Sequence, residues 1–144
     1  MVYFFNQVPF GNHMAKKISL PPDAFLQVCG SRAVLTRVGQ KWTVLAMVAM
    51  ASTPRRFGDL RRRLDGISQK MLTQTLRAME RDGLVLRELH DGRPLRVEYA
   101  LSPLGRSLLP IVLKLKRWAE ESLPVIEAHH RSFDRKLARA RDKA

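Results

Sequence analysis

Cysteine is almost absent from the sequence, which has a single one, Cys29, in 144 residues. One cysteine excludes an internal disulfide framework and a cysteine-rich zinc site. Long apolar runs are also missing, since the longest, Trp42 to Ala51, is far shorter than the roughly 20 residues that span a bilayer. Residues 1–11 lack the basic start of a signal peptide. We therefore expect a soluble protein of a reducing compartment, the cytoplasm.

Acidic residues are scarce, because 13 Asp and Glu stand against 26 Lys and Arg, a formal charge of +13. The hydrophobic content of 45% is too high for a disordered polybasic tail and predicts a folded core. A surface this basic indicates a polyanionic partner, either nucleic acid or an anionic membrane. Residues 55–106 and 129–144, with net charges of +5 and +4, are the expected polyanion-facing parts. Residues 107–128 are neutral and strongly apolar, which predicts a packing or association surface.

Signatures of catalysis, cofactor binding and metal binding are missing. The sequence has no Gly-rich phosphate loop and no nucleophile motif. Its histidines have no metal-ligand spacing with Cys29 or with the carboxylates; they are His13, His90, His129 and His130. The sequence therefore predicts a protein that is not an enzyme and that holds neither a cofactor nor a metal.

Hydrophobic periodicity predicts four helices, a hairpin and a fifth helix. The first helix should begin at residues 21–23 and run to 38, with Phe25 and Val28 on its apolar face. The last helix should be kinked or interrupted at Pro110 and Pro124. The other predicted elements are helices at 41–51, 57–64 and 68–81, strands at 84–89 and 97–101, and a last helix that begins after Ser102-Pro103.

Three parts of the chain are predicted. Residues 1–21 are expected to form a flexible N-terminal arm. Translation could naturally start at Met14, so we expect residues 1–13 to be an over-called start or an added segment. Residues 22–128 form the main domain, including a C-terminal dimerisation helix. Residues 129–144 form a basic helical tail.

The predicted helices at 57–64 and 68–81 have the size of a helix-turn-helix, with residues 65–67 as the turn. A basic hairpin follows at once, and this combination is typical of a winged helix. One face of the second of these helices is apolar and should be buried, through Leu72, Leu76 and Met79. The opposite face carries long hydrogen-bond donors and no acidic residue, which suits the major groove: Lys70, Gln74, Arg77 and Arg81.

These residues make double-stranded DNA the expected partner. Gln74 and Arg77 are the candidate readers of base edges, because both can pair bidentately with a base. Free N–H groups at the start of the helix favour phosphate. Alternatively, the charged residues of this helix are ordinary solvated surface charges that contact no DNA. Lys41 could likewise form a salt bridge inside the fold instead of a phosphate contact. The candidate DNA contacts are Ser68, Gln69, Lys70, Thr73, Gln74, Arg77, Arg81, the wing residues Arg93 and Arg96, and Lys41.

Several motifs, in the right order, resemble those of the HxlR-type winged helix-turn-helix transcriptional regulators, which are related to the MarR-like and ArsR-like regulators. The resemblance covers roughly Cys29 to Trp118 and departs from the family at Gly30 and Gln40, outside the DNA-reading segment. The motifs are Gly39-x-Lys41-Trp42, Arg56-Phe57-x-x-Leu60, Gly66-Ile67-Ser68-x-Lys70-Met71-Leu72, Leu76-x-x-Met79-Glu80-x-Asp82-Gly83-Leu84-Val85-x-Arg87 and Val97-Glu98-Tyr99-x-Leu101-Ser102-x-x-Gly105-x-Ser107-Leu108.

The resemblance implies a bacterial homodimer that binds operator DNA, usually as a repressor, through a mainly α fold with a small β-hairpin wing (α+β). It implies dimerisation through the N- and C-terminal helices, which agrees with the neutral apolar block. A palindromic operator would present half-sites roughly 34–36 Å apart. Trp42 and Phe57 are expected core anchors, and Glu98 is expected to pair with an arginine. The candidate dimer residues are Leu108, Ile111, Val112, Leu115, Trp118 and Ala119.

Cys29 stands where many HxlR-type proteins carry a cysteine, which the resemblance links, in some of them, to sensing of oxidants or electrophiles. Nearby Arg32 and Arg37 would favour its thiolate. The alternative is an inert cysteine buried at the dimer contact. A crevice between the long helices and the DNA-binding core is the expected place for a small-molecule effector, if there is one.

Three other functions stay open. The chain could be a non-specific, nucleoid-associated DNA-binding protein or a winged-helix protein-interaction module. The tail could also lie on an anionic membrane, although its large apolar groups are only Phe133 and Leu137, which argues against a membrane partner. Strongly salt-dependent duplex binding with a sequence preference would separate the regulator from these alternatives.

Overall fold

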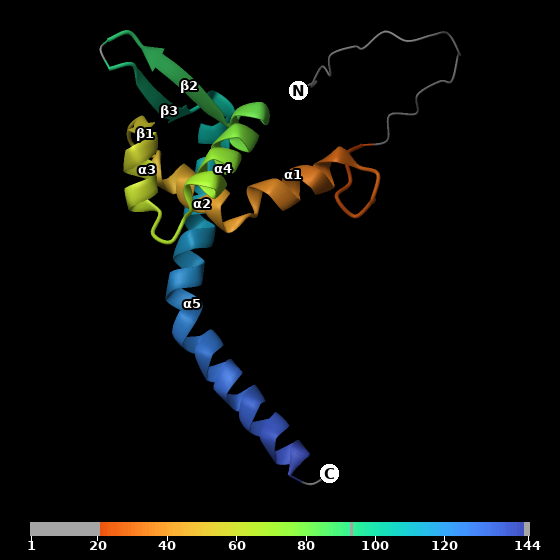
Figure 1. The fold of residues 1–144 in the computed structure, drawn as a ribbon. Helices are drawn as coiled ribbons and strands as arrows, with labels where there is room; N and C mark the ends of the chain where they lie inside the picture. Colours follow the sequence, from red (N-terminus) through yellow and green to blue (C-terminus); the bar gives the residue numbers. More distant parts are fainter. Residues whose placement is uncertain (1–20, 93, 143–144) are drawn as a thin grey trace, which may run out of the picture.

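The computed structural model describes residues 21–92 and 94–142, so the predicted arm at 1–21 lies outside this part of the chain except for its last residue. The described residues form five helices and a three-stranded antiparallel sheet of order β1-β3-β2 (Figure 1). The mainly α, α+β class is thereby confirmed. The elements are α1 (Gly30–Val38), α2 (Lys41–Ala49), β1 (Arg55–Arg56), α3 (Phe57–Arg63), α4 (Gln69–Arg81), β2 (Val85–His90), β3 (Arg96–Leu101) and α5 (Pro103–Arg141).

The turn between α3 and α4 and the end of α4 have clear local causes. Gly66 has φ +79°, a conformation that favours glycine, and it reverses the chain after α3. Ser68 then caps α4, because its hydroxyl accepts a hydrogen bond from the Met71 N–H at 3.1 Å. Gly83, with φ +72°, ends the helix. These signals place α4 within one residue of its predicted range.

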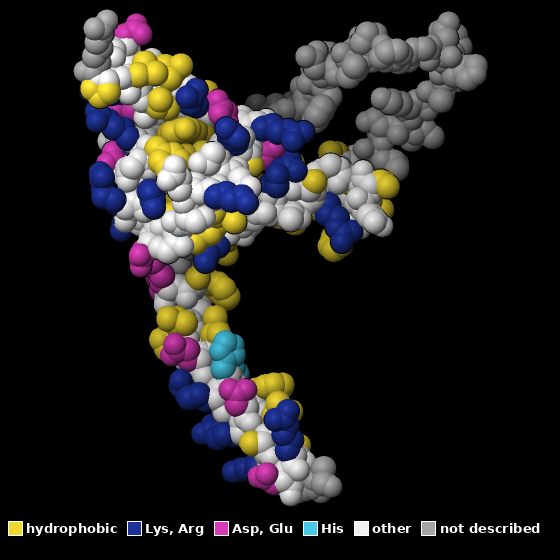
Figure 2. Space-filling view, in the orientation of Figure 1, with side chains coloured by type: hydrophobic (Ala, Val, Ile, Leu, Met, Phe, Trp, Pro, Cys, Tyr) yellow, Lys and Arg dark blue, Asp and Glu magenta, His cyan; other side chains and the backbone are white. Residues whose placement is uncertain are grey.

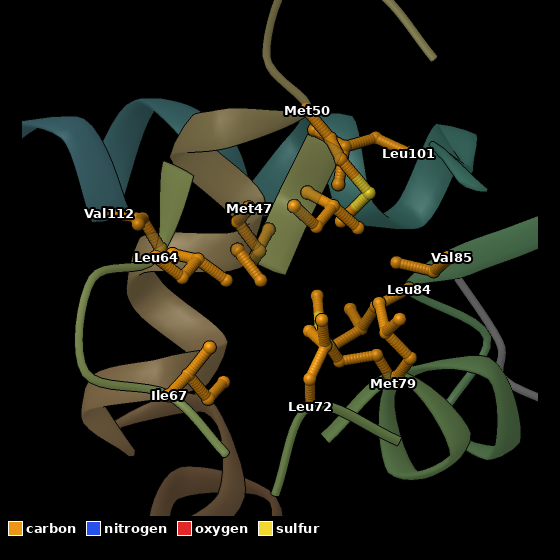
Figure 3. Close-up of a cluster of buried hydrophobic side chains, with 13 residues drawn as sticks. Met47, Met50, Leu64, Ile67, Leu72, Met79, Leu84, Val85, Leu101 and Val112 are labelled. Atoms are coloured by element: carbon orange, nitrogen blue, oxygen red, sulfur yellow. The ribbon is translucent and has the colours of Figure 1, made fainter. Parts of the chain in front are cut away.

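The core lies between α2, α3, α4, the sheet and the first part of α5 (Figure 3). Its largest fully buried side chains are methionine, leucine and valine. Trp42 and Phe57, the expected anchors, pack against this cluster but are only partly buried, so they cover its edge. These largest fully buried side chains are Met47, Met50, Leu60, Leu72, Leu76, Met79 and Val85.

The first helix is shorter than predicted. Residues 21–29 precede α1, with turns at 24–28, and Phe25 and Val28 are 94% and 95% exposed. The Asp23 side chain accepts a hydrogen bond from the Phe25 N–H at 2.9 Å, which closes a local turn in place of a helical one. The apolar spacing of this segment therefore does not reflect a buried helical face in the single chain.

The last helix is one element of 39 residues. Of the two outcomes predicted for Pro110 and Pro124, interruption does not occur, and Figure 1 shows that the axis of the helix bends. Both prolines lie at exposed positions. Because proline has no N–H, the carbonyls of Arg106 and Glu120, four residues earlier, lack their helical hydrogen-bond donor, and at these exposed residues they can bond to water instead. No helix within 21–92 and 94–142 combines the length and apolarity needed to cross a bilayer.

Ser102 joins the start of α5 to the end of α4. Its hydroxyl accepts from the Gly105 N–H at 3.0 Å and donates to the Gly83 carbonyl at 2.5 Å. We expect Ser102→Ala to lower the free energy of unfolding by about 1–2 kcal/mol, because a cap and a partly buried hydrogen bond are lost together. Urea denaturation measures this loss. Ser107→Ala is the control, since its hydroxyl bonds only the exposed Leu104 carbonyl, and equal losses would contradict the role given to Ser102.

Candidate nucleic-acid interface

The two faces of α4 are divided as predicted. Leu72, Leu76 and Met79 are buried, together with Thr75. Lys70, Gln74, Arg77 and Arg81 are exposed on the other side, and so are Ser68 and Gln69. Thr73 is half-buried, and its hydroxyl donates to the Gln69 carbonyl at 2.9 Å. The helix therefore presents a row of long polar side chains to the surroundings.

The cations of this row carry uncompensated charge. Across the described residues, Lys70, Arg77 and Arg81 have no carboxylate within 4.0 Å, the limit for an ion pair. Arg37 differs, because its Nε lies 2.6 Å from Asp82 Oδ2. Figure 2 shows Lys and Arg side chains spread over the head of the molecule that holds α4. Three cations on one helix face that have no acidic partner in the described part of the chain suit a polyanion.

Two hollows flank α4, and Arg77 lines both of them. The first, about 510 Å³, lies between α4 and the sheet and includes Gln69 and Thr73. The second, about 540 Å³, includes Gln74 and Arg81. Arg77 thus lies between the two hollows.

The first hollow also contains residues that the sequence did not suggest. Glu80 lines it as well. It lies on the side of α4 that holds Gln69 and Thr73, away from the row of Lys70, Gln74 and Arg81, and the sheet turns that side into the wall of a groove. Arg87, Phe57 and Tyr99 complete this wall. Val85 is buried, and Arg87 follows it by two residues on the same face of β2, so the two-residue period of a strand is the signal that could have found Arg87.

The wing consists of β2, β3 and the loop between them. Arg96 is exposed, and the predicted contact Arg93 lies outside the described residues. Glu88 and Glu98 are directly opposite one another in the register, and His90 Nε2 lies 3.2 Å from Glu98 and 3.9 Å from Glu88. Arg56 Nε lies 3.6 Å from Glu98, which confirms the expected arginine partner. This face of the wing is therefore partly acidic.

Lys41 and the candidate dimer residues have distinct environments. Lys41 Nζ lies 4.2 Å from the centre of the Trp42 ring, a cation–π contact, and in the described part of the chain it forms no salt bridge. Ile111, Leu115 and Trp118 are 64%, 49% and 60% exposed on α5. Val112 is only 3% exposed because it packs in the domain core, so it has no surface to offer a second copy. Ala119 is exposed, and Leu108 is half-buried against the core.

Cys29 occupies the N-cap position of α1 and is half-buried. The hydrogen bond between Cys29 Sγ and Ser31 Oγ, at 3.0 Å, is the main cause that lowers the pKa of the thiol below its usual value. The Ser31 and Asp23 backbone N–H groups lower the pKa further, against the opposing charge of the Asp23 carboxylate. The predicted cause is corrected, because neither Arg32 nor Arg37 contributes and Arg37 is paired with Asp82.

The family model for HxlR-like helix-turn-helix proteins matches residues 37–127. The chain belongs to the HxlR-like helix-turn-helix family. The uncharacterized HTH-type transcriptional regulator YtfH of Escherichia coli is 43% identical over 106 residues, which cover 74% of this chain and 84% of YtfH. Membership makes the chain a transcriptional regulator with a DNA-binding helix-turn-helix, and not an enzyme.

Solved structures of HxlR-like and similar regulators have the same winged-helix fold. The transcriptional regulator YtfH from Salmonella typhimurium superposes with a TM-score of 0.73 at 40% identity, covering 77% of this chain and 99% of that one. The redox regulator HypR in its reduced form gives a TM-score of 0.63 at 40% identity, covering 68% and 97%. The α3–α4 pair is therefore the helix-turn-helix, with α4 as its second helix. Residues 128–141 of α5 lie beyond the family match.

Proposed function

We propose that this HxlR-like chain is a homodimeric repressor that reads a palindromic operator with α4. The observation that carries the proposal is Arg77, whose exposed guanidinium lines two hollows beside α4 and has no carboxylate partner among the residues that the structure describes. Gln74 and Arg77 read base edges, while Lys70 and Arg81 contact phosphate. Ser68, Gln69 and Thr73 lie near the start of α4, where backbone N–H groups favour phosphate. Arg93, Arg96 and Lys41 are the proposed flanking contacts.

The proposed dimer forms along the exposed apolar side of α5. Ile111, Leu115 and Trp118 expose a contiguous strip at helical spacing, with Ala119 beside it. Exposed apolar side chains in such a row favour association. A two-fold pair would present two copies of α4 to half-sites about 34–36 Å apart. Such a regulator acts in the cytoplasm, on the nucleoid.

The test compares Arg77→Ala with the wild type on a selected operator and on random duplex. Each lost bidentate base contact costs about 1–3 kcal/mol, so operator affinity should fall about 30-fold or more in the dimer while random-duplex affinity falls less. Fluorescence anisotropy at fixed salt measures both. Equal losses on the two duplexes would make Arg77 a phosphate contact. A wild type without any sequence preference would refute operator binding and favour the nucleoid-associated alternative.

A thiol response is the second part of the proposal. The lowered pKa of Cys29 supports it, as does the likeness to HypR, which is named a redox regulator. With one cysteine per chain, an oxidant such as diamide would take two electrons and two protons from a pair of thiols, one of them Cys29 and the other from a second copy or a small thiol. Loss of operator binding after diamide treatment in the wild type, and not in Cys29→Ser, is the expected result.

The Cys29 environment also predicts a pH dependence. Because the folded pKa is lowered, the thiolate should persist to a lower pH than in a free cysteine, and it should be lost by protonation below that folded pKa. Ser31→Ala removes the largest contribution and should shift the alkylation profile with iodoacetamide to higher pH. Thr36→Ala, a hydroxyl later on the same helix, is the control. Identical profiles for wild type and Ser31→Ala would contradict this account.

A further inference from the structure

The hollow between α4 and the sheet is bordered by two hydrogen-bond donors to which the proposed function gives no role. These are Arg87 of β2 and Tyr99 of β3, which line the hollow from the sheet, while Arg77 and Gln69 line it from α4. Arg87 and Tyr99 are directly opposite one another in the strand register, so their side chains leave the sheet on the same face. Donors from two different elements therefore border one space of about 510 Å³.

Both acidic residues of the three strands lie on the other face of the sheet. Glu88 and Glu98 are opposite one another in the register, each one residue along the strand from Arg87 or Tyr99, so they project away from the hollow. Arg56 accompanies them there, with its Nε 3.6 Å from Glu98. Arg87 itself is exposed, and none of the described carboxylates lies within 4.0 Å of its guanidinium. The strands thus separate their acidic side chains from a guanidinium that borders the hollow.

The lining of the hollow favours an anion with several hydrogen-bond acceptors. Two guanidinium groups, of Arg77 and Arg87, border it against one described carboxylate, that of Glu80, so the net charge of the described lining is positive. A guanidinium pairs bidentately with two phosphate oxygens, and a phenolic hydroxyl donates a further hydrogen bond. Phe57 and Leu76 also border the hollow, and an apolar surface of this kind strengthens charge-assisted hydrogen bonds. A phosphate group is therefore the complementary ligand.

A duplex that lies on α4 brings phosphates to this place. The major groove of DNA is about 12 Å wide, so a helix that lies in it has a phosphate backbone along each of its sides. The hollow occupies the side of α4 that faces the sheet, and Figure 1 shows β2 and β3 beside this helix. The backbone on the sheet side of the groove would therefore pass over the hollow.

We propose that Arg87 and Tyr99 bind one backbone phosphate of the DNA in this hollow. The inference rests on the proposed function, because that function places α4 in the major groove. The guanidinium of Arg87 pairs with the phosphate oxygens, and the hydroxyl of Tyr99 donates to them. A phosphate contact carries no sequence information, but it fixes the position of α4 in the groove, so that Gln74 and Arg77 reach the base edges.

The first test measures affinity for random duplex and for the selected operator by fluorescence anisotropy at several salt concentrations. Arg87→Ala should weaken binding to both duplexes by the same factor, about 10-fold or more in a dimer, and should lower the salt slope by about 2, since each lost phosphate contact contributes about 0.9. Arg56→Ala is the matched control, because it removes the same charge from the other face of the sheet. It should change either affinity less than about threefold. Equal losses in the two variants, or an unchanged salt slope in Arg87→Ala, would overturn the inference.

Two conservative variants separate a phosphate contact from a structural role. Tyr99→Phe keeps the ring that packs against the core and loses only the hydroxyl, so it should weaken binding to both duplexes by about threefold or more. Arg87→Lys keeps the charge but not the two-pronged donor, so it should restore the salt slope of the wild type and only part of its affinity. A salt slope in Arg87→Lys as low as that in Arg87→Ala would contradict the proposed charge contact.

A double-mutant cycle locates the phosphate. Each phosphate of the operator is replaced in turn by an uncharged methylphosphonate, and the affinities of the wild type and of Arg87→Ala are compared. At one position in each half-site the replacement should weaken the wild type and leave Arg87→Ala unchanged, because the protein partner of that phosphate is already missing. The same penalty in both proteins at every position would overturn the inference and leave operator binding intact. A wild type without sequence preference would instead refute the proposed operator, and the random-duplex comparison would still decide the role of Arg87.

Discussion

A variant in which Lys70, Arg77 and Arg81 are all alanine should bind its operator at least about 1000-fold more weakly than the wild type. These side chains are exposed, and within the described residues none has an acidic partner, so their charge is available to DNA. A dimer would lose six cations, of which the two Arg77 groups are proposed base readers worth about 1–3 kcal/mol each. The slope of log affinity against log salt should fall by about 4, since each neutralised phosphate contributes about 0.9 and the dimer would lose the phosphate contacts of two Lys70 and two Arg81 side chains.

A second triple variant separates position from net charge. Arg135, Lys136 and Arg139 are exposed near the end of α5, and their replacement by alanine removes the same charge from each chain. We expect less than about threefold loss of operator affinity at moderate salt, because long-range charge alone is strongly screened. Both variants should unfold within about 0.5 kcal/mol of the wild type, since all six positions are on the surface. Equal loss in the two variants would favour a non-specific, charge-driven DNA-binding protein.

The bounds and faces of α4 could be predicted closely because several local signals in the sequence agree there. Ser68 supplies a cap, Gly66 and Gly83 supply the turns, and the apolar positions follow the helical period. These features depend on the chain within a few residues. Burial of Leu72 and exposure of Arg77 then follow from periodicity alone.

The sequence was less informative where distant segments decide the structure. β1 has two residues and no apolar alternation, and it exists because Arg55 and Arg56 pair with Tyr99 and Glu98 of β3. Glu80 becomes part of a groove only because the sheet lies beside α4. In the same way, Arg37 is near Cys29 in the sequence but pairs with Asp82 in space. Local spacing cannot reveal such partners.

Gly105→Ala should strongly destabilise the fold. A Cβ at this position would lie 2.1 Å from the Leu84 carbonyl oxygen and 3.1 Å from its carbon. That oxygen already accepts the Ser102 N–H at 3.0 Å, so the backbone cannot move aside without losing a hydrogen bond. Alanine normally stabilises a helix by about 1 kcal/mol relative to glycine. Here the cost of the steric clash should outweigh this gain, so that the free energy of unfolding falls by about 3 kcal/mol.

Thermal unfolding followed by circular dichroism measures the effect, with an expected fall in Tm of about 10 °C. Gly30→Ala is the matched control, because Gly30 also lies near the start of a helix but has no atom within 4 Å of the added Cβ. It should unfold at the wild-type temperature or slightly above it. Leu84 lies shortly after the end of α4, and Gly105 lies in the first turn of α5. A loss of stability confined to Gly105→Ala would therefore show that this backbone contact anchors α4 on α5. Equal stability of the two alanine variants would instead mean that α5 does not approach Leu84 so closely.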